Sequence, residues 1–308
     1  MWLFFEAIVG LLKITWFNLV GVFRFFVPPT KKPLVGEIVL ITGAGGGIGR
    51  LMAINFAKRG CTLVLWDIDK DGNDETAELI TALGGGGGKA YGYRCDVTNK
   101  DEVYRFAEQV KEDVGSVTIL VNNAEVVAGK NLLDCPDELI LETINVNAIS
   151  NFWSVKAFAP SMVTHNHGHI VTIASLAGSI GAPGMVEYCA SKFAAVGLHE
   201  SLCYEFIKEG YDGIKMTLVQ PYLINTKMFD GFKVREGIAP PALEPQYVAD
   251  KVVDAVQMNQ EVLLLPKDGY ISVWLKSWMS HRSFLTILKF IGALNGMDEF
   301  IGKQKKSK

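Results

Sequence analysis

A glycine-rich turn between a short apolar run and a helical pattern constrains the fold of this chain more than any other feature. Residues 37–42 are mostly apolar, residues 43–49 contain five glycines, and residues 51–58 show helical spacing of apolar side chains. Glycines suit such a turn because its backbone adopts conformations that side chains forbid and closely approaches a pyrophosphate at the positive end of the helix. The turn alone would also suit a flexible loop. If it binds a dinucleotide, the residues expected at the cofactor are Gly43, Gly47, Ile48 and Gly49.

The next apolar run ends in an acidic residue where nucleotide-binding folds contact a ribose. Residues 61–66 are mostly apolar, and Asp67 follows them about 20 residues beyond the glycines. A carboxylate there accepts hydrogen bonds from the adenosine ribose and repels a 2′-phosphate. Gly46, just before Gly47, offers no cation to hold such a phosphate. NAD(H) is therefore favoured over NADP(H) as the cofactor.

Apolar runs alternate with helical patterns along the following part of the chain. Further strands are expected at 90–95, 117–122, 169–174 and 215–220, and helices at 101–113, 137–163 and 186–208. This alternation predicts an α/β fold, a Rossmann-type doubly wound parallel sheet in a single domain. Ligands of such sheets bind beyond the carboxyl ends of the strands. The polar residues expected at these ends are Asp67, Asp96, Asn122 and Ser175.

Tyr188 and Lys192 lie four residues apart in a helical pattern, so they are expected on one face of a helix. A nearby cation lowers the pKa of a phenol, which then exchanges a proton with an alcohol or carbonyl oxygen more readily. The pair alone would also fit a packed ring beside a solvated amine. The other motifs favour hydride-transfer chemistry.

Taken together, the motifs resemble the classical short-chain dehydrogenase/reductase superfamily over roughly residues 36–265. The matching elements are Thr42-Gly43-xxx-Gly47-Ile48-Gly49, Asp96, Asn122-Asn123-Ala124, Asn147, Ser175, Tyr188-xxx-Lys192, and Pro221 followed by Thr226. The apolar N-terminus, residues 65–68, residues 134–138 and the apolar C-terminal tail resemble its 16C branch. That branch includes epidermal retinol dehydrogenases and lies near the 17β-hydroxysteroid dehydrogenases of lipid droplets.

The resemblance implies that Tyr188 exchanges the proton, that Ser175 holds the substrate oxygen, and that Lys192 binds the nicotinamide ribose and lowers the pKa of Tyr188. Asn147 would hold a water that links Lys192 to solvent. The implied catalytic residues are Ser175, Tyr188, Lys192 and Asn147. The implied cofactor contacts beyond the glycine turn and Asp67 are Asp96, Val97, Asn123, Tyr188, Lys192 and Thr226. Ser and Asn at these places would also suit ordinary caps and turns. A homodimer through the helices up to and including Tyr188 is expected by analogy.

Two positions depart from the family pattern. Glu125 follows Asn122-Asn123-Ala124 where the family has glycine, and Tyr222 follows Pro221 where the family again has glycine. A carboxylate at the first turn would strain the backbone or place negative charge near the nicotinamide, so weak cofactor binding or low activity is one hypothesis. Tyr222 is expected either to line the substrate pocket or to lie exposed in a turn.

Composition agrees with one large α/β domain with appendages. The chain has 308 residues, 49% of them hydrophobic and 20% charged, with a net charge of −3. Without a basic stripe or a nucleic-acid motif, no nucleic-acid partner is expected. The five cysteines are scattered through the predicted strands and helices, which indicates reduced core residues. No Cys/His cluster has metal-ligand spacing, so no metal site is expected.

Residues 1–30 form a separate apolar segment, rich in Trp and Phe, that is expected to associate with a membrane. Its charges Glu6, Lys13 and Arg24 fall within about 20° of one another on a helix. The narrow polar stripe permits a helix at the membrane interface, and the length also permits a single span. A signal peptide is disfavoured because a basic n-region and a small-residue cleavage site are missing. A helix packed on the core of the protein is the remaining alternative.

Basic residues indicate where the protein lies in the cell. Arg24, Lys31 and Lys32 flank the apolar segment on the side of the catalytic domain, residues 36–265, which predicts that this domain faces the cytosol. Residues 266–308 are expected to form a substrate lid or a second membrane contact. The final residues 305–308 resemble a dilysine signal for return to the endoplasmic reticulum membrane. A location on lipid droplets is the alternative.

The sequence thus predicts a membrane-associated NAD-dependent oxidoreductase that oxidises a lipophilic alcohol. Retinol, oxidised to retinal, is the leading substrate by resemblance to the 16C branch. A 17β-hydroxysteroid or a long-chain fatty alcohol is the runner-up. From a different class, Glu125 leaves room for a catalytically weak lipid-binding or scaffold protein.

Overall fold

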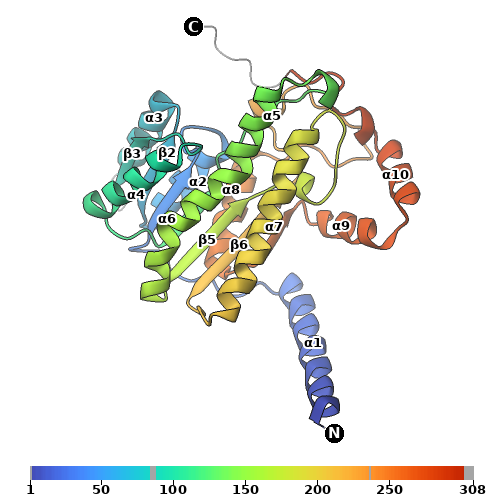
Figure 1. Ribbon diagram of the computed structural model, residues 1–308, viewed down its shortest axis with the longest axis horizontal. Coiled ribbons are helices and arrows are strands. Elements are labelled where there is room, and N and C mark those ends of the chain that lie inside the picture. The colour runs from blue at the N-terminus through green and yellow to red at the C-terminus, as the bar shows by residue number, and fades with distance from the viewer. Residues whose placement is uncertain (1, 84–87, 236, 302–308) are drawn as a thin grey trace.

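A parallel β-sheet forms the centre of the protein (Figure 1). The computed structural model describes residues 2–83, 88–235 and 237–301, and within them the sheet has seven strands in the order β3-β2-β1-β4-β5-β6-β7. The strands are β1 (Ile38–Thr42), β2 (Thr62–Asp67), β3 (Ala90–Arg94), β4 (Ile119–Asn122), β5 (Gly168–Ile173), β6 (Ile214–Pro221) and β7 (Val262–Leu265). The order reverses between β1 and β4, which creates the crevice where doubly wound sheets bind ligands.

Helices cover both faces of the sheet. They are α2 (Gly47–Ala57), α3 (Lys70–Thr81), α4 (Lys100–Asp113), α5 (Asp137–Ile144), α6 (Ser150–His165), α7 (Val186–Lys208) and α8 (Pro245–Met258). One core cluster joins α2, α3 and α8 to the sheet, and a second joins α4, α6 and α7 to the opposite face. The Rossmann-type fold expected from the sequence is confirmed.

Alternation along the strands supplies both cores. In β2, Leu63 and Leu65 pack in the first cluster, while Val64 and Trp66 pack in the second. Successive side chains of a strand point to opposite faces, so a strand covered on both sides is apolar throughout. The Trp66 ring lies 5.4 Å from that of Phe158 on α6. The five cysteines are free thiols, and four of them are buried, as expected for reduced core residues.

The predicted elements are present, with one correction and some additions. The six expected strands match β1 to β6, whereas β7, α3 and α8 were not identified from the sequence. The single helix expected over residues 137–163 is instead α5 and α6 joined by a π-helical turn, Asn145–Ile149. Such turns insert an extra residue and often mark functional sites. Asn147 lies in this one.

The N-terminal helix α1 (Trp2–Phe26) projects away from the rest of the protein (Figure 1). By length and composition it could cross a membrane, and none of its apolar window is buried. The alternative of a helix packed on the protein's own core is therefore wrong. The following linker is tied to α8, because Lys31 Nζ lies 2.5 Å from Asp254 Oδ1 and the Lys32 amide donates to the Gln257 carbonyl at 2.9 Å.

The C-terminal part lies over the carboxyl end of the sheet. It comprises α9 (Gly269–Trp278), α10 (His281–Phe290) and the segment up to residue 301. This segment binds the long loop after β6, because Lys233 N donates to Gly296 O at 2.9 Å and Arg235 N to Ile291 O at 3.1 Å. The loop after β6 and the C-terminal part thus form one continuous cover, which we call the roof. The dilysine pattern at 305–308 lies outside the described residues.

Candidate active site

The glycine turn forms an open cradle at the end of β1. Gly43 and Gly47 have φ angles of +68° and +53°, and a Cβ on Gly43 would lie 2.9 Å from the Ala124 Cα. A Cβ on Gly49 would lie 2.1 Å from the Gly43 carbonyl oxygen, whereas Gly46 and Gly47 face open space. In the described part of the chain no side chain caps the N-terminus of α2. Its amide groups therefore face the crevice, which suits an anion such as a pyrophosphate.

Asp67 lies directly beside this turn at the end of β2. Its Oδ2 accepts a hydrogen bond from the Gly45 amide at 2.7 Å, and its Oδ1 accepts from the Asp69 amide at 2.9 Å. Arg50, which sequence reasoning missed, donates to the Gly45 carbonyl at 2.7 Å and to Glu75 at 2.7 Å. Its position immediately after Gly49, the last glycine of the turn, is the signal in the sequence that could have identified it. Both charged residues hold the turn in shape.

Two further predicted cofactor contacts lie at the end of β3, and a third lies beyond β6. Asp96 Oδ1 accepts hydrogen bonds from the Thr98 amide at 2.9 Å and the Thr98 hydroxyl at 2.7 Å. Val97 is buried in the second core cluster. Thr226 is half-buried in the loop after β6, where its amide donates to the Ile224 carbonyl at 2.7 Å. Thr226 belongs to the roof, apart from the glycine turn.

Asn123 joins the end of β4 to the glycine turn. Its Nδ2 donates to the carbonyls of Thr42 at 2.9 Å and Gly43 at 3.1 Å, and its amide donates to the Thr42 hydroxyl at 2.9 Å. The side chain is buried. Asn123 thus fixes the two strand ends at the point where the strand order reverses.

Tyr188 and Lys192 lie on one face of α7, as their spacing predicts, and both are buried. Lys192 is 1% exposed, donates from Nζ to the Ile173 carbonyl at 3.0 Å, and lies 5.5 Å from the centre of the Tyr188 ring. The Tyr188 ring packs edge-on against Phe229 at 5.7 Å. A buried ammonium is costly unless it is paired. The reading of Lys192 as a solvated amine is therefore wrong.

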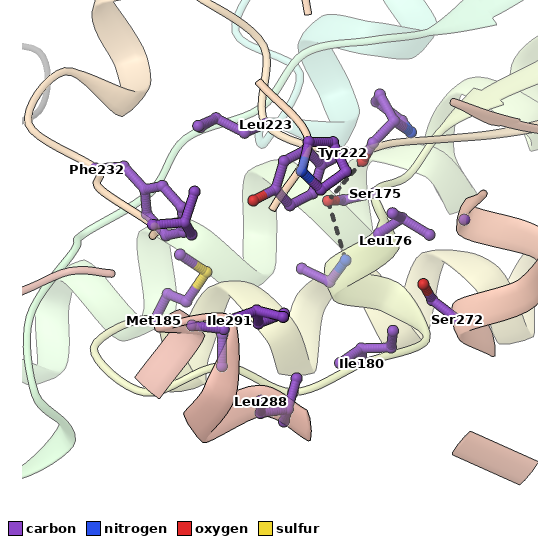
Figure 2. Close-up of a pocket in the computed structure, with 18 of the residues that line it drawn as sticks. Ser175, Leu176, Ile180, Met185, Tyr222, Leu223, Phe232, Ser272, Leu288 and Ile291 are labelled. Atoms are coloured by element: carbon purple, nitrogen blue, oxygen red, sulfur yellow. Dashed lines mark hydrogen bonds between the residues drawn. The ribbon is translucent and has the colours of Figure 1, made fainter. Parts of the chain in front are cut away.

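Ser175 follows β5 and lies beside Tyr188. Its hydroxyl donates to the Pro221 carbonyl at 3.3 Å and accepts from the Ala177 amide at 3.1 Å (Figure 2). A hydrogen bond with Ser175 also acts on Tyr188, in the direction that lowers the pKa of the phenol. The structure thus brings Ser175, Tyr188 and Lys192 together from two separate elements.

Asn147 supports this group from the π-helical turn. Its Oδ1 accepts from the Val126 amide at 2.8 Å, and its Nδ2 donates to the Val126 carbonyl at 2.8 Å and to the Ser191 hydroxyl at 3.0 Å. The side chain therefore ties the segment after β4 to α7. Its expected role in holding a water beside Lys192 stays a prediction.

Glu125 takes part in the group although it is absent from the predicted site residues. Its Oε2 lies 2.6 Å from Lys192 Nζ and accepts a hydrogen bond from the Tyr188 hydroxyl at 3.2 Å. Burial raises the pKa of Tyr188 well above its usual value, and the Glu125 charge raises it further. Glu125 also pairs with Lys192, and the expected lowering of this pKa by Lys192 stays a prediction.

An apolar pocket opens beside Ser175 and Tyr188. Its wall is built from the loop after β5, the roof loop after β6, α9, α10 and the tail. Apolar side chains surround Ser175 in Figure 2, among them Leu176, Ile180, Met185, Phe232, Leu288 and Ile291. Tyr222 lines the pocket, where burial raises its pKa to about 12, so the alternative of an exposed turn tyrosine is wrong.

Known proteins resemble this chain in sequence and in fold. The family model for short chain dehydrogenases matches residues 37–236. Retinol dehydrogenase 10-B of Danio rerio is 42% identical over 98% of this chain and 96% of its own length. Epidermal retinol dehydrogenase 2 of Homo sapiens is 45% identical over 91% of this chain and 90% of its own length.

Solved structures agree with these relatives. A short chain dehydrogenase/reductase from Burkholderia phymatum in complex with NAD has a TM-score of 0.71 at 25% identity, covering 90% of this chain and 99% of that one. A metagenomic short-chain oxidoreductase in complex with NADP has a TM-score of 0.63 at 28% identity, covering 76% of this chain and 98% of that one. Since the family model spans more than half of the chain and both curated relatives align with most of it, the chain belongs to the short-chain dehydrogenase family.

Proposed function

We propose that the protein is a membrane-associated NAD-dependent dehydrogenase that oxidises a lipophilic alcohol, with retinol as the leading substrate. The observation that carries this proposal is the placement of Ser175 and Tyr188 on an otherwise mostly apolar pocket. Such a pocket takes a long hydrocarbon and leaves only the substrate oxygen to polar groups. The retinol dehydrogenases among the relatives supply the substrate class.

The chain offers a fitting place for the adenosine and pyrophosphate parts of a dinucleotide. Gly43 lies so close to Ala124 that a side chain at position 43 would not fit between the two strand ends. Gly46 and Gly47 are exposed, and the space beside them at the start of α2 is open. The α2 amides would hold the pyrophosphate, and Asp67 would bind the ribose. NAD, when bound, supplies the hydride acceptor.

The remaining chemistry belongs to side chains of this protein. The Ser175 hydroxyl would donate a hydrogen bond to the substrate oxygen, which acquires alkoxide character as hydride leaves the neighbouring carbon. Tyr188 would take the proton from that oxygen. The Lys192 ammonium, 5.5 Å from the Tyr188 ring centre, would stabilise the phenolate form of Tyr188 that accepts this proton.

The direct test is retinal formation from retinol and NAD by membranes that contain the full chain. Product above that of membranes without the chain would support the proposal. If retinol gives none, hydroxysteroids and long-chain fatty alcohols should be tried next. Failure with every alcohol would favour a weak lipid-binding or scaffold protein.

Asp67→Asn is expected to reduce the preference for NAD over NADP about tenfold. The substitution keeps the side-chain shape but removes the charge that would repel a 2′-phosphate, a close-range interaction of order 1 kcal/mol or more. Asp67 also binds the Gly45 amide at 2.7 Å, so affinity for both cofactors can fall. The measurement is therefore the ratio of kcat/KM for the two cofactors. An unchanged ratio would contradict the assigned role.

We further propose three regions: a membrane-associating segment 1–30, a catalytic domain 36–265 and a tail from 266 that closes the pocket. The exposed, apolar α1 would hold the protein at the endoplasmic reticulum membrane or on a lipid droplet. Arg24, Lys31 and Lys32 favour a cytosolic catalytic domain. Attachment would place the pocket beside alcohols dissolved in the lipid.

Deleting residues 2–26 is expected to release the protein from membranes. The full chain should stay in the pellet after a high-salt wash, whereas the deletion variant should move to the soluble fraction. The deleted helix packs none of its apolar window on the domain, so folding should survive its loss. Tight sedimentation of a folded deletion variant with membranes would show that another surface anchors it.

A further inference from the structure

Glu125 lies where the second half of a dinucleotide has to pass. The strand order reverses between β1 and β4, and a dinucleotide binds across the crevice at that point. The glycine turn after β1 and Asp67 after β2 serve one half. The other half must therefore lie over the ends of β4 and β5, where Glu125 and Ser175 follow the strands.

The backbone on both sides of Glu125 is fixed. Ala124 donates from its amide to the Thr42 hydroxyl at 3.0 Å and lies against Gly43. Val126 forms two hydrogen bonds with the Asn147 side chain, one at its amide and one at its carbonyl, each 2.8 Å long. With both neighbours held, this segment resists moving away as a whole. The Glu125 side chain therefore has to occupy the crevice, where it lines the pocket.

The Glu125 carboxylate engages the positive charge of the site. Its Oε2 lies 2.6 Å from Lys192 Nζ, and the lysine is 1% exposed against 16% for Glu125. Charges pair strongly when water is largely excluded, because the effective dielectric constant falls. The same oxygen accepts the Tyr188 hydroxyl at 3.2 Å. One carboxylate thus holds both groups that should face the reacting end of the cofactor.

We infer that Glu125 sets the affinity of this protein for its dinucleotide cofactor, because its carboxylate competes with the cofactor for Lys192 and has to move aside before the nicotinamide half can bind. The inference rests on the proposed function. When only a fraction of the protein has the carboxylate displaced, the apparent Kd rises by the inverse of that fraction. Removing the carboxylate therefore tightens binding.

Binding of NADH to the purified full chain in detergent, followed by NADH fluorescence, tests the inference without turnover. Glu125→Gly removes both the charge and the bulk and is expected to lower the Kd at least about tenfold, the change for a site open one time in ten. Glu125→Gln keeps the bulk and loses the charge, so its Kd should fall between those of the other two. Glu142→Gln on the exposed face of α5 is the matched control and should leave the Kd unchanged.

Each outcome is decisive. Equal Kd values for the wild type and Glu125→Gly, or a weaker Kd for Glu125→Gly, would overturn the inference while NADH binding still supported the proposed function. Absence of NADH binding in all folded variants, with folding checked by circular dichroism, would overturn both. A tighter Kd in Glu125→Gly alone, without a change in Glu125→Gln, would overturn competition of the carboxylate for Lys192 and leave side-chain bulk as the cause.

Discussion

Tyr188→Phe is expected to lower kcat for alcohol oxidation by roughly 10²- to 10⁴-fold, the range for loss of a positioned acid–base group. The substitution removes only the hydroxyl oxygen. The ring keeps its edge-on contact with Phe229, and the ion pair of Glu125 with Lys192 stays intact. Cofactor affinity and the unfolding midpoint should therefore change little. The measurement is kcat for the oxidation of retinol with NAD, together with the NADH Kd.

A matched substitution separates the chemistry from the loss of any tyrosine hydroxyl. Tyr93→Phe deletes a hydroxyl that donates to Asp113 at 3.0 Å. Tyr93 lies on β3, the edge strand farthest from β7 and the pocket. Its kcat should equal that of the wild type. If Tyr188→Phe retained most of the activity, Tyr188 would not be the proton acceptor, and the proposed mechanism would be wrong.

Ser175→Ala is expected to lower kcat about 10²- to 10³-fold, as for removal of one hydrogen-bond donor to a developing oxyanion. The Ala177 amide fixes the position of the hydroxyl oxygen, and the single hydroxyl proton, which donates to the Pro221 carbonyl at 3.3 Å, only has to turn toward the substrate oxygen. A donor whose oxygen is already in place stabilises the developing charge with little reorganisation. KM should change much less than kcat, because the hydrogen bond strengthens mainly as charge develops on the oxygen.

Ser179→Ala provides the control for Ser175→Ala. The Ser179 hydroxyl accepts a hydrogen bond from Gln220 Nε2 at 2.7 Å, close to Ser175 in the chain but outside the pocket lining. Both substitutions leave a donor without its acceptor and should reduce stability by roughly 1–3 kcal/mol. Only Ser175→Ala should reduce kcat. A parallel loss of activity in both variants would show that Ser175 acts through folding alone.

The contacts of Glu125 with Lys192 and Tyr188 are expected to affect the activity of the protein. The retained Ser175, Tyr188 and Lys192 are the groups that hydride-transfer chemistry needs. Glu125 nevertheless pairs with Lys192 and raises the pKa of Tyr188. A protein with complete catalytic groups and a weakened cofactor site would show low activity that rises with the NAD concentration. This explanation differs from loss of the catalytic groups themselves, because saturating NAD would restore turnover.

Much of the fold was readable from local patterns. Six strands and the Tyr188–Lys192 helix follow from hydrophobic periodicity, which depends only on neighbouring residues and the geometry of each element. The glycine turn followed by Asp67 identified the nucleotide end of the crevice for the same reason. The strand β7 was missed, because a short continuous apolar run cannot be told from part of a buried helix by periodicity alone. The π-helical turn at Asn147 was missed as well, since it keeps the helical pattern on both sides.

The sequence by itself determined the family, the order of the elements and the identity of Ser175, Tyr188 and Lys192, because these depend on spacing within short segments. The tertiary structure alone decided what these residues meet. Glu125 and Tyr188 are 63 positions apart, and only the pairing of β4 with β5 and the packing of α7 on β5 bring the carboxylate onto the phenol and the lysine. The pocket is likewise assembled from distant loops and helices. Contacts between distant segments depend on how whole elements pack, and no local pattern encodes that packing.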